Sequence, residues 1–240
     1  MANQLVYFGE HVGGIYIEGD NDKKNLYSDA ATTCVICFIW GKVEGVFTVI
    51  YAHLNATRAI KEFFRRVDEY CFGKTIGELD VYAIGGARVN NCGIEMAELF
   101  LDKLNAMKTP KNFLSNDKVG RQDQHWLGFD CHNKQVIHEK FNLEKEADLN
   151  MYGPQCTAFM LHSNVALVWM DNSFEIDQSQ VAQNSLIYLA NKLHKSRNEL
   201  LKNSTSPTIE PEEYFQNIYT GGIYALRVLE QILQAQNGDA

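Results

Sequence analysis

The fold of this 240-residue chain is decided by the stretch Ser28–Trp40, which reads SDAATTCVICFIW, together with the segment Val46–His53, VFTVIYAH. Both segments are rich in β-branched and aromatic residues, and the short turn sequence Gly41–Gly45 separates them. This pattern predicts two antiparallel strands joined by a tight turn. Cys34 opens the first strand, and His53 closes the second.

The pairing of these two strands follows from the position of the turn. A turn centred on Val43–Glu44 places Cys34 opposite His53 and Trp40 opposite Phe47. These side chains then share one face, because side chains alternate along a strand. Directly opposed residues have Cβ atoms about 4.5–5.5 Å apart, so a thiol can contact an imidazole. The sequence therefore predicts a Cys–His pair at the open end of an apolar face.

A cysteine beside a histidine is the arrangement that nucleophilic catalysis uses. A free thiol with a pKa of about 8.5 is only slightly ionised at neutral pH, and a neighbouring imidazole raises that fraction. A third polar group would fix the orientation of the imidazole. Ser28 is the first candidate for this group and Asp29 the second. The pattern alone leaves open a structural reading, in which Cys34 and His53 only pack in the core.

The rest of the chain up to residue 107 predicts strands packed with two helices. Asn55 is a good helix cap, apolar residues recur after it at helical spacing, and Gly13-Gly14 predicts a turn. The expected elements are strands over Leu5–Phe8, Ile15–Ile17 and Leu79–Ile84, and helices from Asn55 to Cys71 and over Ile94–Met107. They indicate an α+β fold with an antiparallel-rich sheet, in which residues 1–107 form the core.

Residues 108–240 are expected to form a β-strand and helical extension packed on that core, within one domain spanning 1–240. The segment Thr109–Gln124 is polar and is typical of a surface connection. The further expected elements are a hairpin over Trp126–Phe141 around His132-Asn133, a strand pair over Thr157–His162 and Ala166–Met170, and helices over Val181–Leu201 and Pro211–Gln234.

The composition argues against several classes of protein. The net charge is −8 and the pI about 5.4, and no basic patch with interleaved aromatic residues occurs, so nucleic acid is not an expected partner. The N-terminal residues lack the features of a signal peptide, and no apolar run approaches the roughly 20 residues that span a bilayer. The six cysteines are therefore expected to be reduced thiols in a cytoplasmic protein.

No metal site is expected from the local pattern. Cys34 and Cys37 form a C-x-x-C sequence, but within a strand this spacing directs the two sulfurs to opposite faces. No second C-x-x-C and no cluster of histidines completes a zinc site. We therefore expect neither a metal nor an organic cofactor.

Three stretches resemble one enzyme family. Ser28–Cys34 resembles the S-D-D-A-T-T-C signature of protein N-terminal asparagine amidohydrolases, except that Ala30 replaces the second aspartate. His53 looks like the histidine that closes the next strand in that family. Leu79–Gly86 is similar to the family's L-E-V-H-L-V-G-G, and Ser204–Phe215 is similar to its S-T-S-P-x-x-E-P-x-x-F. The matches lie far apart and in the same order, so the resemblance extends over most of the chain.

The first half of the chain also resembles bacterial chemoreceptor glutamine deamidases of the CheD type. Those proteins have a hydroxyl residue at the spacing of Ser28, a histidine at the end of the following strand, and an A-G-G-A segment like Ile84–Ala87. Both resemblances imply a CheD-like cysteine deamidase fold. They also imply the same reaction, hydrolysis of a protein side-chain carboxamide.

The resemblance implies deamidation of an N-terminal asparagine to aspartate, with release of ammonia through a cysteine thioester. Cys34 would be the nucleophile, His53 the general acid and base, and Ser28 the group that orients His53. Backbone N–H groups around Thr33 and Cys34 would hold the oxyanion.

Selectivity for a chain terminus requires a group that recognises the α-ammonium, and Glu10 and Asp29 are the candidates. The expected partners are proteins or peptides with an N-terminal asparagine, in the cytoplasm, with the nucleus open as a second compartment. In the family picture the product enters the N-degron route to ubiquitin-dependent degradation. Two other functions stay open: an internal protein-glutamine deamidase of the CheD type, and a catalytically inactive module that binds N-termini.

Overall fold

The structure is a computed structural model, and it describes residues 4–19, 24–29, 31–115, 117–141, 149–150 and 166–170. These residues form eleven strands and two helices. In chain order the elements are β1 (Gln4–Tyr7), β2 (Val12–Ile17), β3 (Lys24–Ser28), β4 (Val35–Val43), β5 (Val46–Leu54), α1 (Thr57–Cys71), β6 (Leu79–Gly85), α2 (Asn91–Ala106), β7 (Lys111–Phe113), β8 (Leu127–Asp130), β9 (Gln135–Ile137), β10 (Leu149–Asn150) and β11 (Val168–Met170).

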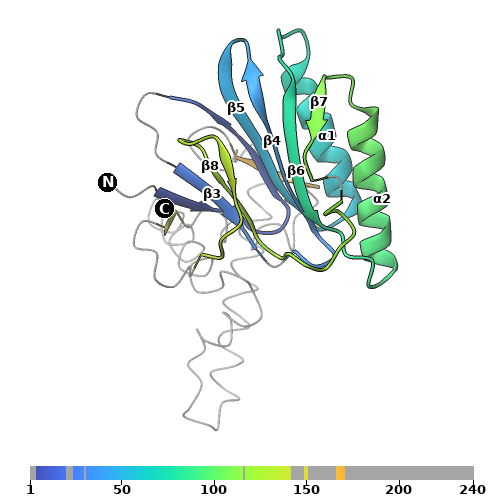
Figure 1. Cartoon of the computed structure of the whole chain (residues 1–240). Coiled ribbons are helices and arrows are strands. Elements are labelled where there is room, and N and C mark those ends of the chain that lie inside the picture. Colours follow the sequence, from blue (N-terminus) through green and yellow to red (C-terminus); the bar gives the residue numbers. More distant parts are fainter. Residues whose placement is uncertain are drawn as a thin grey trace, which may run out of the picture.

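The elements form three layers (Figure 1). A six-stranded sheet has the order β11-β2-β5-β4-β6-β7, and a five-stranded sheet has the order β10-β1-β3-β8-β9. Helices α1 and α2 cover one face of the six-stranded sheet, and the five-stranded sheet packs on its other face. The predicted α+β class is confirmed, and strands that follow residue 107 belong to both sheets.

The alternation of side chains along β4 divides the core into two parts. Ile36, Phe38 and Trp40 point toward the five-stranded sheet, where the ring of Phe38 packs edge-on against that of Phe8 with centroids 5.8 Å apart. Cys37, one position along, points to the opposite side and packs with the helices. Cys34 lies with the first group, so the prediction that Cys34 and Cys37 occupy opposite faces is confirmed.

The β4–β5 hairpin forms as predicted, but its register is shifted by two residues. Val43 pairs with Val46, and His53 pairs with Ile36 rather than with Cys34. The turn consists of Glu44 and Gly45, which both have positive φ, 52° and 79°. Two such residues form the tight turn whose twist matches that of paired strands, and this geometry decides the register.

A shift of two residues leaves the faces unchanged, because the side-chain period of a strand is two. The side chain of His53 therefore stays on the face of Ile36 and Phe38, and Cys34 becomes its diagonal neighbour instead of its direct partner. Cys34 and His53 are therefore still close together, although the predicted register was wrong by two residues.

The turn predicted at Gly13-Gly14 is wrong, because both glycines lie inside β2. The chain reverses earlier, at Glu10 and His11. A Cβ atom on Gly14 would lie 2.5 Å from the hydroxyl oxygen of Tyr51, and one on Gly13 would lie 3.1 Å from the side chain of Leu167. The glycines thus make room for neighbouring side chains rather than for a turn.

Helix α1 is confirmed, but Asn55 does not cap it. The N-cap is Ala56, which has no side-chain cap, and the Asn55 amide reaches Glu10 instead. Helix α2 begins three residues before the predicted position, because the Asn90 side chain accepts a hydrogen bond from the backbone N–H of Gly93. Neither helix is long and apolar enough to cross a membrane.

Three described strands, β3, β7 and β10, were not predicted. β3 and β10 both pair in parallel with β1, and β7 lies within the segment expected to be a surface connection, where it pairs in parallel with β6. The β8–β9 hairpin is confirmed, and β11 confirms the strand expected over Ala166–Met170. Outside the described residues lie the predicted strand Thr157–His162, the helices Val181–Leu201 and Pro211–Gln234, and the Ser204–Phe215 motif.

The segment that carries Cys34 is held by the end of β6. Gly85 has a φ of 90°, and a Cβ atom placed on it would overlap the carbonyl oxygen of Cys34. The next residue, Gly86, donates its backbone N–H to that same carbonyl oxygen at 2.7 Å. Only a residue without a side chain permits this approach.

We predict that Gly85→Ala lowers the free energy of unfolding by about 2–4 kcal/mol, because the backbone strain and the clash with Cys34 add. Gly45→Ala is the matched control, since Gly45 also has positive φ but no atom lies within 4 Å of the position that its Cβ would take. Its cost should be only about 1 kcal/mol. Urea unfolding followed by circular dichroism measures both values, and equal losses would contradict the proposed contact.

Candidate functional site

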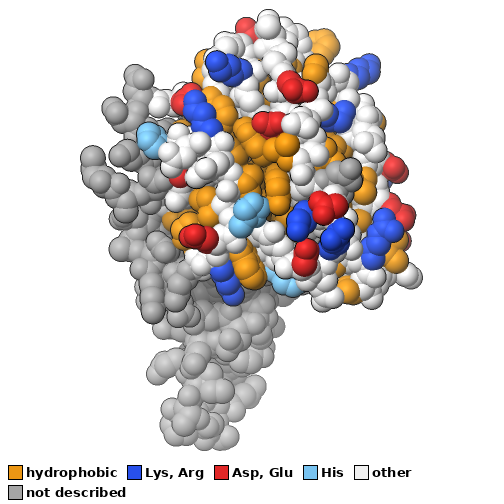
Figure 2. All heavy atoms as spheres, in the orientation of Figure 1, with side chains coloured by type: hydrophobic (Ala, Val, Ile, Leu, Met, Phe, Trp, Pro, Cys, Tyr) orange, Lys and Arg blue, Asp and Glu red, His pale blue; other side chains and the backbone are white. Residues whose placement is uncertain are grey.

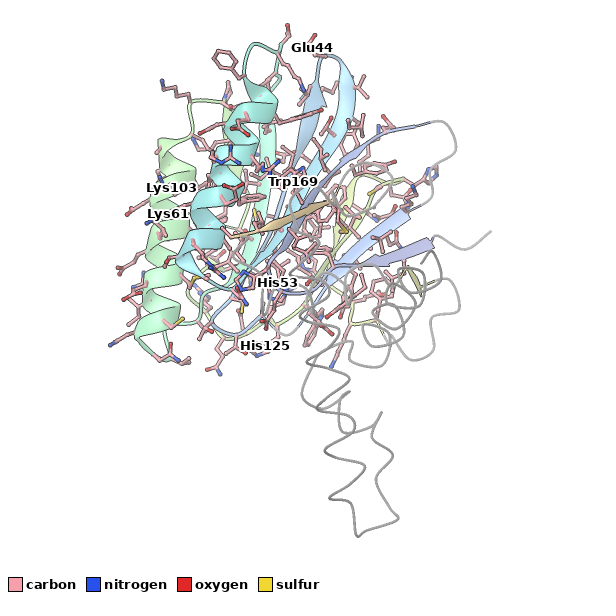
Figure 3. The ribbon with its side chains drawn as sticks, turned by 180° about the vertical axis from the view of Figure 1, so that it is seen from behind. Glu44, His53, Lys61, Lys103, His125 and Trp169 are labelled. Carbon is pink, nitrogen blue, oxygen red and sulfur yellow. The ribbon has the colours of Figure 1, made fainter. Side chains whose placement is uncertain are left out.

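Five polar residues from separate elements converge at the end of the sheets that lies away from the β4–β5 turn. Glu10 lies in the turn between β1 and β2, Ser28 ends β3, and Cys34 immediately precedes β4. His53 lies near the end of β5, and Asn55 follows that strand. In Figure 3, His53 lies at the opposite end of the sheet from Glu44, the turn residue.

The hydrogen bonds of Ser28 fix the tautomer of His53. The Ser28 hydroxyl donates to the carbonyl oxygen of Phe8 at 2.5 Å, and its single proton is thereby used. Its oxygen lies 2.8 Å from Nδ1 of His53 and can only accept. Nδ1 therefore carries the ring proton, and Nε2 keeps its lone pair. The predicted orienting role of Ser28 matches this geometry.

The thiol of Cys34 lies between a histidine and a carboxylate. The sulfur is 4.0 Å from Oε1 of Glu10, and a ring nitrogen of His53 lies within 4.8 Å of both groups. Since Nδ1 of His53 is hydrogen-bonded to Ser28, Nε2 is the nitrogen available to the thiol. The other carboxylate oxygen of Glu10 accepts a 2.9 Å hydrogen bond from the Asn55 amide, which holds the carboxylate in place.

The prediction that His53 lowers the pKa of Cys34 is not met in this environment. Burial, followed by the negative charge of Glu10, raises the pKa of the Cys34 thiol to about 12. The Thr33 hydroxyl and the backbone N–H of Cys34 act in the opposite direction but more weakly. Burial also lowers the pKa of His53 to about 3, with a smaller effect from His11. Thiol and imidazole are therefore both neutral when no other molecule is bound.

The backbone around Cys34 is fixed on both sides. The Ala87 N–H donates to the carbonyl oxygen of Thr32 at 2.8 Å, and the carbonyl oxygen of Ala31 lies 3.0 Å from Nδ1 of His125. Thr33 lies between these contacts and is partly exposed. Its hydroxyl and the Cys34 N–H both act to lower the pKa of the thiol, so the backbone at Thr33 and Cys34, where an oxyanion site is predicted, lies next to the Cys34 sulfur.

Asp29, predicted as an alternative orienting or substrate-binding residue, is not brought to this group. It follows Ser28 in the chain, so its side chain points to the other face of the five-stranded sheet. There it accepts a 2.9 Å hydrogen bond from the hydroxyl of Tyr7, beside the apolar cluster that contains Tyr27. Burial raises the pKa of Asp29. The hydrogen bond with Tyr7 gives Asp29 a structural role, away from Cys34 and His53.

Asn55 is the residue of this site that the sequence did not indicate. Its position just before a helix suggested a cap, and no local pattern connects it with Glu10, which lies 45 residues earlier. Glu10 was a candidate only because a carboxylate was needed. The expectation of no metal site likewise rested on the spacing of cysteines and histidines along the chain. In the structure, potential ligand atoms of Glu10, Cys34 and His53, which come from three separate elements, lie close together.

Among the described residues on the face shown in Figure 2, charge indicates no second candidate site. On the face shown in Figure 2, basic side chains lie beside acidic ones and apolar ones rather than in one basic patch. The five cysteines of the described residues, Cys34, Cys37, Cys71, Cys92 and Cys131, are free thiols.

Comparison with known proteins assigns no family. A scan against protein-family models finds no match, and a search of curated proteins finds no matching sequence. The resemblance to N-terminal asparagine amidohydrolases and CheD-type deamidases therefore stays a prediction.

We predict that Glu10→Gln accelerates alkylation of Cys34 by iodoacetamide at pH 8. The negative charge of Glu10 raises the pKa of the thiol, so its removal lowers the pKa and increases the thiolate fraction. The rate should rise about three- to tenfold, with burial still keeping it below that of a free thiol. Mass spectrometry of the peptide that contains Cys34 measures the rate separately from the other cysteines.

Glu78→Gln is the control, because this exposed glutamate precedes β6 at the end of the strand away from Cys34. It should leave the alkylation rate unchanged. An unchanged or slower rate in Glu10→Gln would show that Glu10 does not control the thiol.

Proposed function

We propose that this protein is a cysteine amidohydrolase that converts an N-terminal asparagine of a protein or peptide into aspartate and releases ammonia. The observation that supports this most is the Ser28–His53 hydrogen bond, which leaves the Nε2 lone pair of a buried imidazole for the neighbouring Cys34 thiol. The motif resemblance supplies the substrate, and a cytoplasmic location belongs to the same proposal.

In the first step, the Cys34 sulfur bonds to the carboxamide carbon while the thiol proton moves to Nε2 of His53. The imidazolium then gives that proton to the amide nitrogen, the C–N bond breaks, and ammonia leaves a thioester behind. A water molecule next attacks the thioester and gives a proton to His53. The C–S bond breaks, the sulfur regains a proton, and aspartate is released.

The pKa values favour general-base catalysis over a preformed thiolate–imidazolium pair. A thiol with a pKa of about 12 holds its proton until attack begins, so His53 must remove it as the C–S bond forms. The burial that lowers the pKa of His53 makes its imidazolium a stronger acid than a free imidazolium, and makes the neutral imidazole a correspondingly weaker base. This imidazolium readily protonates the departing nitrogen, which is the poor leaving group of amide hydrolysis.

Glu10 is the proposed receptor for the α-ammonium. Three bonds separate the α-nitrogen of asparagine from its carboxamide carbon, a span of about 3–4 Å from standard bond lengths. A carboxylate oxygen 4.0 Å from the attacking sulfur is therefore within reach of that ammonium. Asn55 orients the carboxylate from its other oxygen. A substrate in which the amine is acetylated, or an internal side chain, offers no positive charge at this position.

The substrate's charge would also activate the thiol. Glu10 is the second-largest cause of the raised pKa of Cys34. An ammonium bound to Glu10 neutralises that charge, and the pKa of the thiol falls. Recognition of a free N-terminus and activation of the nucleophile are thus one electrostatic event.

A module that binds N-termini without turnover is the second candidate. The observation that favours it is the raised pKa of Cys34, which is typical of a buried, unreactive thiol. The same Glu10–Asn55 pair would bind the ammonium in that case. Turnover of a peptide separates the two functions.

We predict that the wild-type protein releases ammonia from peptides that begin with asparagine, and that Cys34→Ser abolishes this release. Peptides that begin with glutamine and acetylated asparagine peptides should not react, because the first misplaces the carboxamide and the second removes the charge. Mass spectrometry detects the replacement of the amide nitrogen by oxygen.

Binding of asparagine peptides without any product would favour the binding module, and reaction of internal glutamines in folded proteins would favour the CheD-type activity.

We predict that Ser28→Ala lowers kcat by about 10–100-fold with little change in KM, because His53 loses the group that fixes its tautomer and orientation. Ser115→Ala is the matched control: Ser115 is also buried, and it hydrogen-bonds the backbone of Ala83. This control should lose stability but keep kcat in its folded fraction. Equal losses of kcat in both variants would indicate that Ser28 is only structural.

A further inference from the structure

The site contains a set of potential metal ligands that the proposed reaction does not use as such. The Cys34 sulfur, a carboxylate oxygen of Glu10 and a ring nitrogen of His53 all lie within 4.8 Å of one another. Each comes from a different element, the turn after β1, the segment before β4 and the end of β5. Sulfur, imidazole nitrogen and carboxylate oxygen together form a donor set that suits zinc.

A second observation points independently to a ligand. His53 is fully buried, and its Nε2 has no hydrogen-bond partner among the described residues. A buried nitrogen with a free lone pair is costly, because it has lost water without gaining a partner. Since Nδ1 carries the proton that bonds to Ser28, Nε2 is in the form that coordinates a metal.

Two of the three potential ligands are held by further residues, as metal ligands usually are. Ser28 fixes the imidazole of His53 through Nδ1, and Asn55 fixes the carboxylate of Glu10 through the oxygen that does not face Cys34. The remaining carboxylate oxygen lies 4.0 Å from the sulfur. Zinc bonds of about 2.0–2.3 Å at tetrahedral angles require neighbouring ligand atoms roughly 3.5 Å apart, so a small closure of the side chains suffices.

We propose that Glu10, Cys34 and His53 bind one zinc ion and leave its fourth coordination position open. Binding forms Zn–S, Zn–N and Zn–O bonds, and the thiol proton of Cys34 leaves to solvent. Magnesium and calcium do not suit this site, because they take oxygen donors and not thiolate.

Zinc bound here would inhibit the proposed deamidation. It occupies the sulfur that must attack, the Nε2 lone pair that must accept a proton, and the carboxylate that must bind the ammonium. This consequence rests on the proposed function, whereas the binding of zinc does not. A free N-terminus and zinc would compete for the same site.

Cobalt(II) tests the site, because it takes zinc positions and absorbs light when it is bound by thiolate. Titration of the full-length protein with Co²⁺ should give tetrahedral visible bands and a sulfur-to-cobalt charge-transfer band that saturate at one ion per chain. Added Zn²⁺ should remove both bands. Absence of the charge-transfer band in the wild-type protein would overturn the proposal.

Variants assign the ligands. Cys34→Ser should abolish the charge-transfer band, and Glu10→Gln and Asn55→Ala should weaken Co²⁺ binding about 10–100-fold. Cys92→Ser is the matched control, because Cys92 is the exposed free thiol whose charge acts on Cys34, and its loss should leave the band unchanged if Cys34 is the ligand. A band that persists in Cys34→Ser, or that disappears in Cys92→Ser, would overturn the assignment.

A measurement on the wild-type protein keeps the test independent of variant folding. Stoichiometric Zn²⁺ should block alkylation of Cys34, and a chelator should restore it. Cobalt bands without any deamidation would support the metal site and contradict the proposed function. Deamidation that proceeds at full rate with saturating Zn²⁺, in a protein that shows no cobalt band, would support the function and contradict the metal site.

Discussion

The structure depends on one buried chain of hydrogen bonds, which runs from Nδ1 of His53 through the Ser28 hydroxyl to the carbonyl oxygen of Phe8. Ser28 belongs to the five-stranded sheet, Phe8 directly follows β1 of that sheet, and His53 belongs to the six-stranded sheet. Between these sheets the interface is otherwise mainly apolar. Leaving a buried polar group without a partner is costly, so the Ser28–His53 hydrogen bond favours the packing in which these two side chains meet. The same bond decides which imidazole nitrogen stays available.

The environment that this packing creates has opposite effects on recognition and on reactivity. Burial and the Glu10 carboxylate hold the thiol of Cys34 in its neutral form. A neutral thiol is protected from unwanted alkylation and oxidation, which act on the thiolate. A ligand that brings positive charge to Glu10 reverses this effect, whether the charge is an ammonium or a metal ion. The proposed substrate and the proposed inhibitor thus act through one carboxylate.

The sequence predicted where strands and helices lie better than it predicted strand register and the positions of turns. The hairpin of β4 and β5 and its inward face follow from alternation, which is a property of consecutive residues. Its register was wrong because it depends on the backbone angles of Glu44 and Gly45. Gly13-Gly14 was misassigned for a related reason: a glycine needed for close packing looks the same in sequence as a glycine needed for a turn.

By itself, the sequence determined that Cys34 and His53 share one face of an apolar hairpin and that Ser28 is the candidate to orient the histidine. The first inference needs only the period of a strand and a short turn, and the second rests on the position of Ser28 before Cys34 and on the family resemblance. Only the tertiary structure decided that Glu10 and Asn55 complete the site and that Asp29 lies on another face. Glu10 comes from the turn before β2 and Asn55 from the end of β5, and the antiparallel pairing of those strands brings them together. Such contacts depend on how strands pair, and no local period records that pairing.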